Sequence, residues 1–165
     1  MEPNEALGIA AQVAIALAGF AGVVVVFRPD AVHTWRRLDR TRLQLLLHNS
    51  LCPLAYALFG MFLLTIKPTP LWIWRESSLF GLLFQMPGGI IAFRNARLLT
   101  PEEKTHTSKI LLLTIGTMGV LTQLLQVWNV ATLNQFWPFF LAIVMHLMAG
   151  MLQFTRMVLL LPEKK

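Results

Sequence analysis

The sequence predicts an all-α protein, a polytopic membrane bundle of five transmembrane helices. Its 165 residues are 56% hydrophobic and only 13% charged, whereas soluble chains carry roughly 25% charged residues. The charges are gathered between long apolar runs, and a chain this short cannot build a soluble core that hides so much apolar surface. The runs are close to the roughly 20 residues that a helix needs to cross a bilayer.

The apolar runs define a single transmembrane domain over residues 1–165, because the segments between them are too short to fold separately. An odd number of spans places the two ends of the chain on opposite sides of the membrane. The spans are expected at about 7–27, 43–66, 78–98, 109–131 and 138–161.

The first span carries a small residue at every fourth position, which forms a ridge on one helical face. Such a ridge lets two helices in lipid approach closely. It either packs against a neighbouring helix of the same chain or forms a contact between subunits of a homo-oligomer. The ridge residues are Ala10, Ala14, Ala18 and Gly22, and the polar residue of this span is Gln12.

The second span carries polar residues in helical register. His48 and Cys52 are four residues apart, and Asn49 is adjacent. The span is expected to end before the two prolines of segment 67–70, because proline lacks an amide donor and disfavours helix at the residue before it.

The third span is the least regular. Gln85 precedes Pro87, Gly88 and Gly89 in the middle of its apolar run, where we expect a helix break. Two interpretations stay open. The break is either a kink that improves packing, or an unwound segment that lies against protein or a water-filled cavity.

The fourth and fifth spans carry neutral polar residues on one face. Polar groups are costly in hydrocarbon, so these faces are expected to point into the bundle. The residues concerned are Gln123 and Gln126 in the fourth span and His146 and Gln153 in the fifth.

Together with the polar residues of the earlier spans, these side chains either hold the helices together by hydrogen bonds or line an aqueous path or pocket. No Asp, Glu or Lys is expected at mid-membrane depth, which disfavours a proton relay or a coupled ion pump. A passive pore needs no such group. The candidate path residues are Gln12, His48, Asn49, Gln85, Gln123, Gln126, His146 and Gln153.

Basic residues are sorted to one side of the five-span arrangement. All Lys and Arg residues except Lys67 and Arg75 fall in segments 28–42 and 94–109 or near the C-terminus. The positive-inside rule then places the N-terminus outside and the C-terminus in the cytoplasm. The Arg-rich segment after the first span is expected to contact lipid headgroups. Its residues are Arg36, Arg37, Arg40 and Arg42.

The five tryptophans are expected to form aromatic belts at the two membrane interfaces. Trp72, Trp74, Trp128 and Trp137 fall near the predicted outer interface, and Trp35 falls near the inner one.

No catalytic residue, cofactor or metal site is expected. The sequence lacks a Gly-rich phosphate loop, a Cys/His metal spacing and a recognisable nucleophile with its base. Two imidazoles can ligate a haem, but the rise per residue places His48 and His146 at different depths in the predicted spans. The net charge of +6 is explained by membrane topology, so no nucleic acid is expected as a partner.

The first half of the chain resembles a group of small bacterial multi-span membrane proteins. The resemblance is carried by the Gly-Phe-Ala-Gly-Val run at 19–23, followed by Trp35, Asp39-Arg40 and Trp74-Arg75. It implies the bacterial inner membrane as the location. No activity follows from it.

The expected function is that of a non-enzymatic integral membrane protein that self-associates, and a small channel or pore is one form of it. The alternative is an accessory or scaffold subunit of a larger membrane complex. A third interpretation is a lipid- or cofactor-binding membrane enzyme that uses His48, Asn49 or His146. The expected partners are membrane lipids and either copies of the chain or that larger complex.

Overall fold

The computed structural model describes residues 1–27, 31–35, 37–98 and 109–159, and within them every long element is a helix. The predicted all-α bundle is therefore confirmed. The long helices are α1 (Pro3–Val26), α2 (Arg37–Thr65), α3 (Ile73–Arg97), α5 (Lys109–Trp128) and α6 (Phe136–Leu159). A 3-10 turn, η1 (Val32–Thr34), precedes α2, and a π-helical turn, η2 (Asn129–Leu133), joins α5 to α6.

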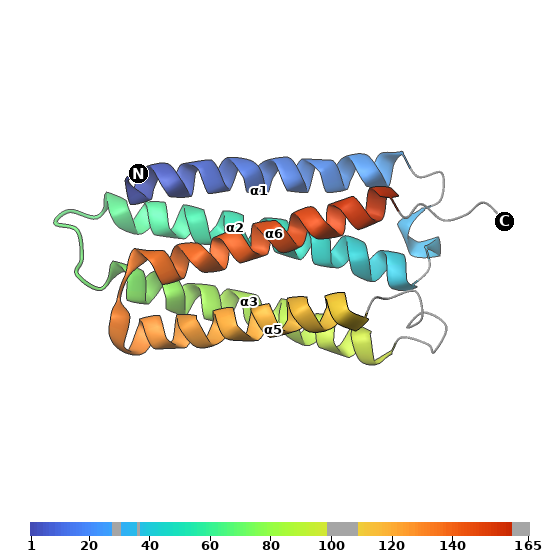
Figure 1. Cartoon of the computed structure of the whole chain (residues 1–165). Coiled ribbons are helices and arrows are strands. Elements are labelled where there is room, and N and C mark those ends of the chain that lie inside the picture. Colours follow the sequence, from blue (N-terminus) through green and yellow to red (C-terminus); the bar gives the residue numbers. More distant parts are fainter. Residues whose placement is uncertain (28–30, 36, 99–108, 160–165) are drawn as a thin grey trace.

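The five long helices of the described chain run back and forth along one axis (Figure 1). The N-terminus lies at the same end as the α2–α3 and α5–α6 connections, and α6 ends at the opposite end. Helix α2 is central, since it packs against α1, α3 and α6. Helix α5 is peripheral and contacts α3 and α6.

Three helices of the described chain, α1, α2 and α6, are long and apolar enough to cross a membrane. This supports a membrane protein by length and composition. Helix α3 is more polar, because it begins with Arg75 and Glu76 and ends with Arg94 and Arg97. The five-span topology stays a prediction.

The small-residue ridge of α1 is partly buried inside the chain. Ala10 and Ala14 belong to a core cluster with Tyr56 on α2 and Ile143 on α6. Small side chains allow this close approach of α1 to its neighbours. Toward the other end of α1, Ala18 is half-buried and Gly22 is exposed, with no atom within 4 Å of the position that a Cβ would take.

Helix α3 is continuous through Pro87, Gly88 and Gly89, so the unwound segment is wrong, and the kink at this position stays a prediction. Proline removes a single donor from the backbone ladder. Because the helix continues on both sides of Pro87, the remaining backbone N–H and C=O groups stay hydrogen-bonded. An apolar environment strongly favours this, since it offers these groups no other partner.

Trp35 differs from the predicted belt residue. It is 6% exposed and packs in a second core cluster with Ala21, Leu46 and Met157. The turn η1 directs the chain back onto the bundle just before α2 begins, so the indole lies over the ends of α1, α2 and α6. Three other tryptophans are about half-exposed at the opposite end, namely Trp72, Trp128 and Trp137.

The α5–α6 connection is held by Asn129, whose side chain is fully buried. Its amide nitrogen donates to Ser78 Oγ at 2.7 Å and to the Gln135 carbonyl at 3.1 Å, and its Oδ1 accepts from the Gln135 N–H at 2.8 Å. Asn134 adopts a left-handed conformation with φ of 49° and accepts the Arg75 N–H at 2.9 Å. These bonds fix the relative positions of α3, α5 and α6.

Candidate functional site

A cavity of about 530 Å³ lies between α2, α3, α5 and α6. Its wall is largely apolar, with Met118, Met145, Met148 and Leu152 among the lining residues. Small residues at Gly88, Gly89, Gly119, Ala142 and Ala149 make room for it on three of the helices.

Five of the polar residues that the sequence singled out meet at this cavity. His48 and Asn49 come from α2, Gln85 from α3, Gln123 from α5 and His146 from α6. The neighbouring positions Thr114 and Thr122 on α5 complete the polar part of the lining.

His146 is the centre of the polar cluster, and both of its ring nitrogens face amide groups. Nδ1 lies 2.9 Å from Asn49 Oδ1, and Nε2 lies 3.0 Å from Gln85 Oε1. A neutral imidazole donates from one nitrogen and accepts at the other. One of the two amides therefore presents its NH₂ group to a neutral His146, and the cluster links α2, α3 and α6.

Gln85 Oε1 is a shared acceptor. It accepts from Gln123 Nε2 and lies within 3.4 Å of the Tyr56 hydroxyl. Tyr56 also donates to the Gly81 carbonyl at 2.9 Å. Gln85 thus connects all the helices around the cavity.

Sequence reasoning missed Tyr56, which is 1% exposed. The signal was present, because Tyr56 continues the four-residue spacing of His48 and Cys52 along one face of α2. Its ring packs edge-on against Phe80, Phe84 and His146, with centroids 5.6–6.3 Å apart.

His48 and His146 lie side by side, with ring centroids 6.0 Å apart. The expectation that they lie at different depths is therefore wrong. Helix α2 begins at Arg37, earlier than the predicted span at 43, and both histidines fall near the middle of their helices. No group of three or more His, Cys, Asp or Glu side chains in the described ranges is placed to hold a metal ion.

The His48 ring rests directly on Gly88 of α3. A Cβ at Gly88 would lie closer to the ring atoms of His48 than non-bonded atoms come, so a larger residue there would force the His48 ring to move. The ring nitrogens of His48 lie 3.5 Å from Cys52 Sγ. A thiol is a weak hydrogen-bond partner, so this contact holds the ring loosely.

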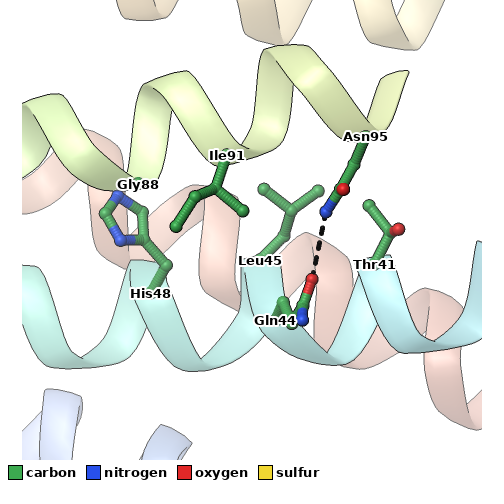
Figure 2. Close-up of a pocket in the computed structure, with 7 residues that line it drawn as sticks. All are labelled: Thr41, Gln44, Leu45, His48, Gly88, Ile91 and Asn95. Carbon is green, nitrogen blue, oxygen red and sulfur yellow. Dashed lines mark hydrogen bonds between the residues drawn. The ribbon is translucent and has the colours of Figure 1, made fainter. Parts of the chain in front are cut away.

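A second cavity of about 190 Å³ lies between α2 and α3 (Figure 2). It shares Leu45, His48 and Gly88 with the larger cavity. Its other lining residues are Thr41, Gln44, Ile91 and Asn95. Asn95 Nδ2 donates to Gln44 Oε1 at 3.1 Å across the two helices.

Three of the candidate path residues do not line the larger cavity. Gln12 is exposed on the outer surface of α1. Gln126 is buried and donates to the Pro138 carbonyl at 2.6 Å, which ties α5 to the start of α6. Gln153 is buried further along α6. Pro87 is exposed on α3 and lines neither cavity, unlike Gly88 and Gly89.

The candidate headgroup arginines within the described residues lie on α2. Arg37 and Arg40 are exposed, and Arg37 donates to the Leu98 carbonyl at 3.0 Å. Arg42 is 8% exposed and lies 3.4 Å from Asp39 Oδ1. Arg36 lies outside the described residues.

Comparisons of the chain with protein-family models, with curated proteins and with solved structures found no match.

Proposed function

We propose that this chain is a non-enzymatic membrane protein that binds a small, uncharged amphipathic molecule in the cavity between α2, α3, α5 and α6. One observation carries the proposal. A cavity between the helices, with a mostly apolar wall, has neutral hydrogen-bonding groups gathered in one region, around His146. Clefts of this size, apolar with a few placed polar groups, are the usual form of small-molecule sites.

The lining residues argue for an uncharged ligand. Among the described residues that line the larger cavity, none is Asp, Glu, Lys or Arg. A charged group would enter this low-dielectric site without a counter-charge, which is strongly unfavourable. An amide, carbonyl or hydroxyl group on the ligand would instead find donors and acceptors at Gln123, Asn49 and His48.

The distribution of charge supports five spans, with the N-terminus outside and the end where α6 stops in the cytoplasm. The end that carries the N-terminus has both signs of charge, with Lys67 and Arg75 near Glu2, Glu5 and Glu76. The other end is strongly basic, as the positive-inside rule requires of a cytoplasmic face. Its described arginines are Arg37, Arg40, Arg42, Arg94, Arg97 and Arg156. The resemblance to small bacterial membrane proteins favours the inner membrane.

The packing of Tyr56 favours a closed pocket over a pore. Beyond the polar cluster, toward the outer end, Tyr56 is surrounded by Phe80, Phe84 and Phe139 at centroid distances of 6.3 Å. A water-filled path needs hydrogen-bonding groups along its length. An aromatic cluster in line with the cavity does not supply them.

Association with further subunits is a separate proposal. Ala10 and Ala14 are already used inside the chain, so a homo-oligomeric contact or a contact with a larger membrane complex would use the exposed part of the ridge around Gly22. This part has open space for the close approach of another helix.

The ligand proposal is tested by purifying the protein in a mild detergent, extracting the bound molecules and identifying them by mass spectrometry. The Gly119→Leu variant fills the cavity, because Gly119 lines it and a Cβ there meets no atom within 4 Å. Gly116→Leu is the matched control on the same helix, with the same open surroundings but outside the cavity lining.

We expect one uncharged amphiphile to co-purify near a one-to-one ratio with the wild type and with Gly116→Leu, and to be depleted in Gly119→Leu. A wild-type preparation that carries only the bulk lipid mixture of the membrane contradicts the proposal. So does a ligand that both variants retain equally.

A further inference from the structure

The two cavities share part of their lining. Leu45, His48 and Gly88 line both of them, and the His48 ring stands between the two spaces against α3. Figure 2 shows this ring at one end of the smaller cavity and the Gln44–Asn95 pair at the other. The smaller cavity therefore extends from His48 toward the ends of α2 and α3 that carry the arginines.

The smaller cavity lies at the basic end of the bundle. Thr41 is near the start of α2, and Asn95 is near the end of α3. Gln44 is exposed and Asn95 is half-buried, so their hydrogen bond crosses the mouth of the cavity at the surface. Surface hydrogen bonds between neutral side chains contribute only about 0.5–1.5 kcal/mol. This one can open readily.

We propose that this smaller cavity is the entrance to the larger one from the cytoplasmic end, and that His48, seated on Gly88, is the constriction that selects by size what passes. The inference rests on the proposed function, since it supplies the route by which the ligand reaches its site.

The surroundings of His48 suit a movable constriction. Its ring is half-buried, and within the described residues its hydrogen-bonding contact is with the Cys52 thiol. His146, by contrast, is held at both nitrogens by amides. Rotation of His48 away from Gly88 breaks no strong hydrogen bond, and the space above a glycine backbone is then free for a ligand to pass.

Access along this route can be measured with one introduced cysteine, because Cys52 is the single cysteine of the sequence and can be replaced. A Cys52→Ala background with Gly119→Cys places one thiol inside the larger cavity. Inverted membrane vesicles expose the cytoplasmic face to an uncharged thiol reagent with a polyol head, which crosses lipid slowly and brings no charge into the cavity. The rate of labelling then measures access from the basic end and requires no bound ligand.

Three further changes are compared in this background. His48→Ala removes the constriction and should raise the labelling rate several-fold. Ile91→Trp fills the smaller cavity and should lower the rate several-fold. Ile90→Trp is the matched control, because Ile90 is equally exposed on α3 but does not line the cavity, and it should leave the rate unchanged.

Equal labelling rates in Ile91→Trp and Ile90→Trp would refute the proposal that the smaller cavity is the entrance. This comparison tests the proposal even if His48→Ala fails to fold. Labelling that is faster from the outer face, or no labelling by the uncharged reagent, would overturn it as well. Labelling with the expected pattern in a protein that carries no ligand would leave the entrance standing and refute the binding function.

Discussion

Replacing Gln85 with leucine tests the polar cluster directly. Gln85 Oε1 accepts from Gln123 Nε2 and faces His146 Nε2 at 3.0 Å. Leucine is close in size but removes the acceptor, so two partly buried donors lose their partner. Each such loss costs about 1–3 kcal/mol, and hydrogen bonds between membrane helices measure about 0.6 kcal/mol on average.

Water in the adjoining cavity can hydrate one of the two donors, so the expected loss in the free energy of unfolding is that of the other donor, about 1–3 kcal/mol. The assay is equilibrium unfolding in mixed micelles of mild detergent and dodecyl sulfate, followed by tryptophan fluorescence. Met86→Leu is the control, because Met86 is the adjacent residue and its side chain is 58% exposed.

The free energy of unfolding of Gln85→Leu should be lower than that of Met86→Leu by that amount. If the two variants unfold at the same detergent fraction, the bonds at His146 do not hold the helices together, and the reasoning about the cluster fails.

Gly88→Ala should destabilise the fold by about 1 kcal/mol in the same titration, the low end for overpacking, because the added methyl displaces the loosely held His48 ring. Gly89→Ala meets open space and should not destabilise the fold, so equal effects of the two variants would refute the contact. Asn129→Ala should lower the free energy of unfolding by about 2–3 kcal/mol, because the hydrogen bonds to Ser78 and Gln135 are lost. An unchanged free energy of unfolding would show that these bonds do not hold the α5–α6 turn. Ala14→Leu should overpack the core and lower the free energy of unfolding by about 1–3 kcal/mol. Gly22→Leu should leave the free energy of unfolding unchanged and lower the particle mass measured by light scattering. The same mass in Gly22→Leu and wild type would show that the ridge is not a subunit contact.

The helices themselves were largely predictable from the sequence. Each expected span falls within one observed helix or its adjoining turn over the described residues, because long apolar runs separated by charged or proline-rich segments leave few other arrangements. The expected end of the fifth span, residues 160–161, lies outside the described residues. The helix starts were less predictable. Residues 37–42 are polar and look like a loop, yet they form the first turns of α2, and this moves His48 toward the middle of the bundle.

The sequence predicted most of the residues of the site but not how they are arranged around the cavity. Helical spacing indicated inward faces for His48, Gln85, Gln123 and His146, and these side chains do meet at one cavity. Spacing along one helix says nothing of the rotation of its neighbours, so the bonds of His146 to Asn49 and Gln85 could not be foreseen. For the same reason Gln12, on the outward face of α1, was grouped with them wrongly.

Two further differences have a tertiary origin. Trp35 is an ordinary belt residue by its position in the sequence, but a short 3-10 turn brings it into the core beside Met157. Pro87 predicts a break in isolation, but Gly88 is there to receive the His48 ring, and the helix stays continuous around that contact. Both outcomes depend on residues far away in the chain.

The most direct test of the binding function is an electron-density map of the protein crystallised from a lipidic mesophase. We expect density for one amphiphile in the space enclosed by α2, α3, α5 and α6, with a polar group within hydrogen-bonding distance of Gln123, Asn49 or His48. A cavity that contains only water, or only acyl chains that make no polar contact with these residues, would contradict the proposal.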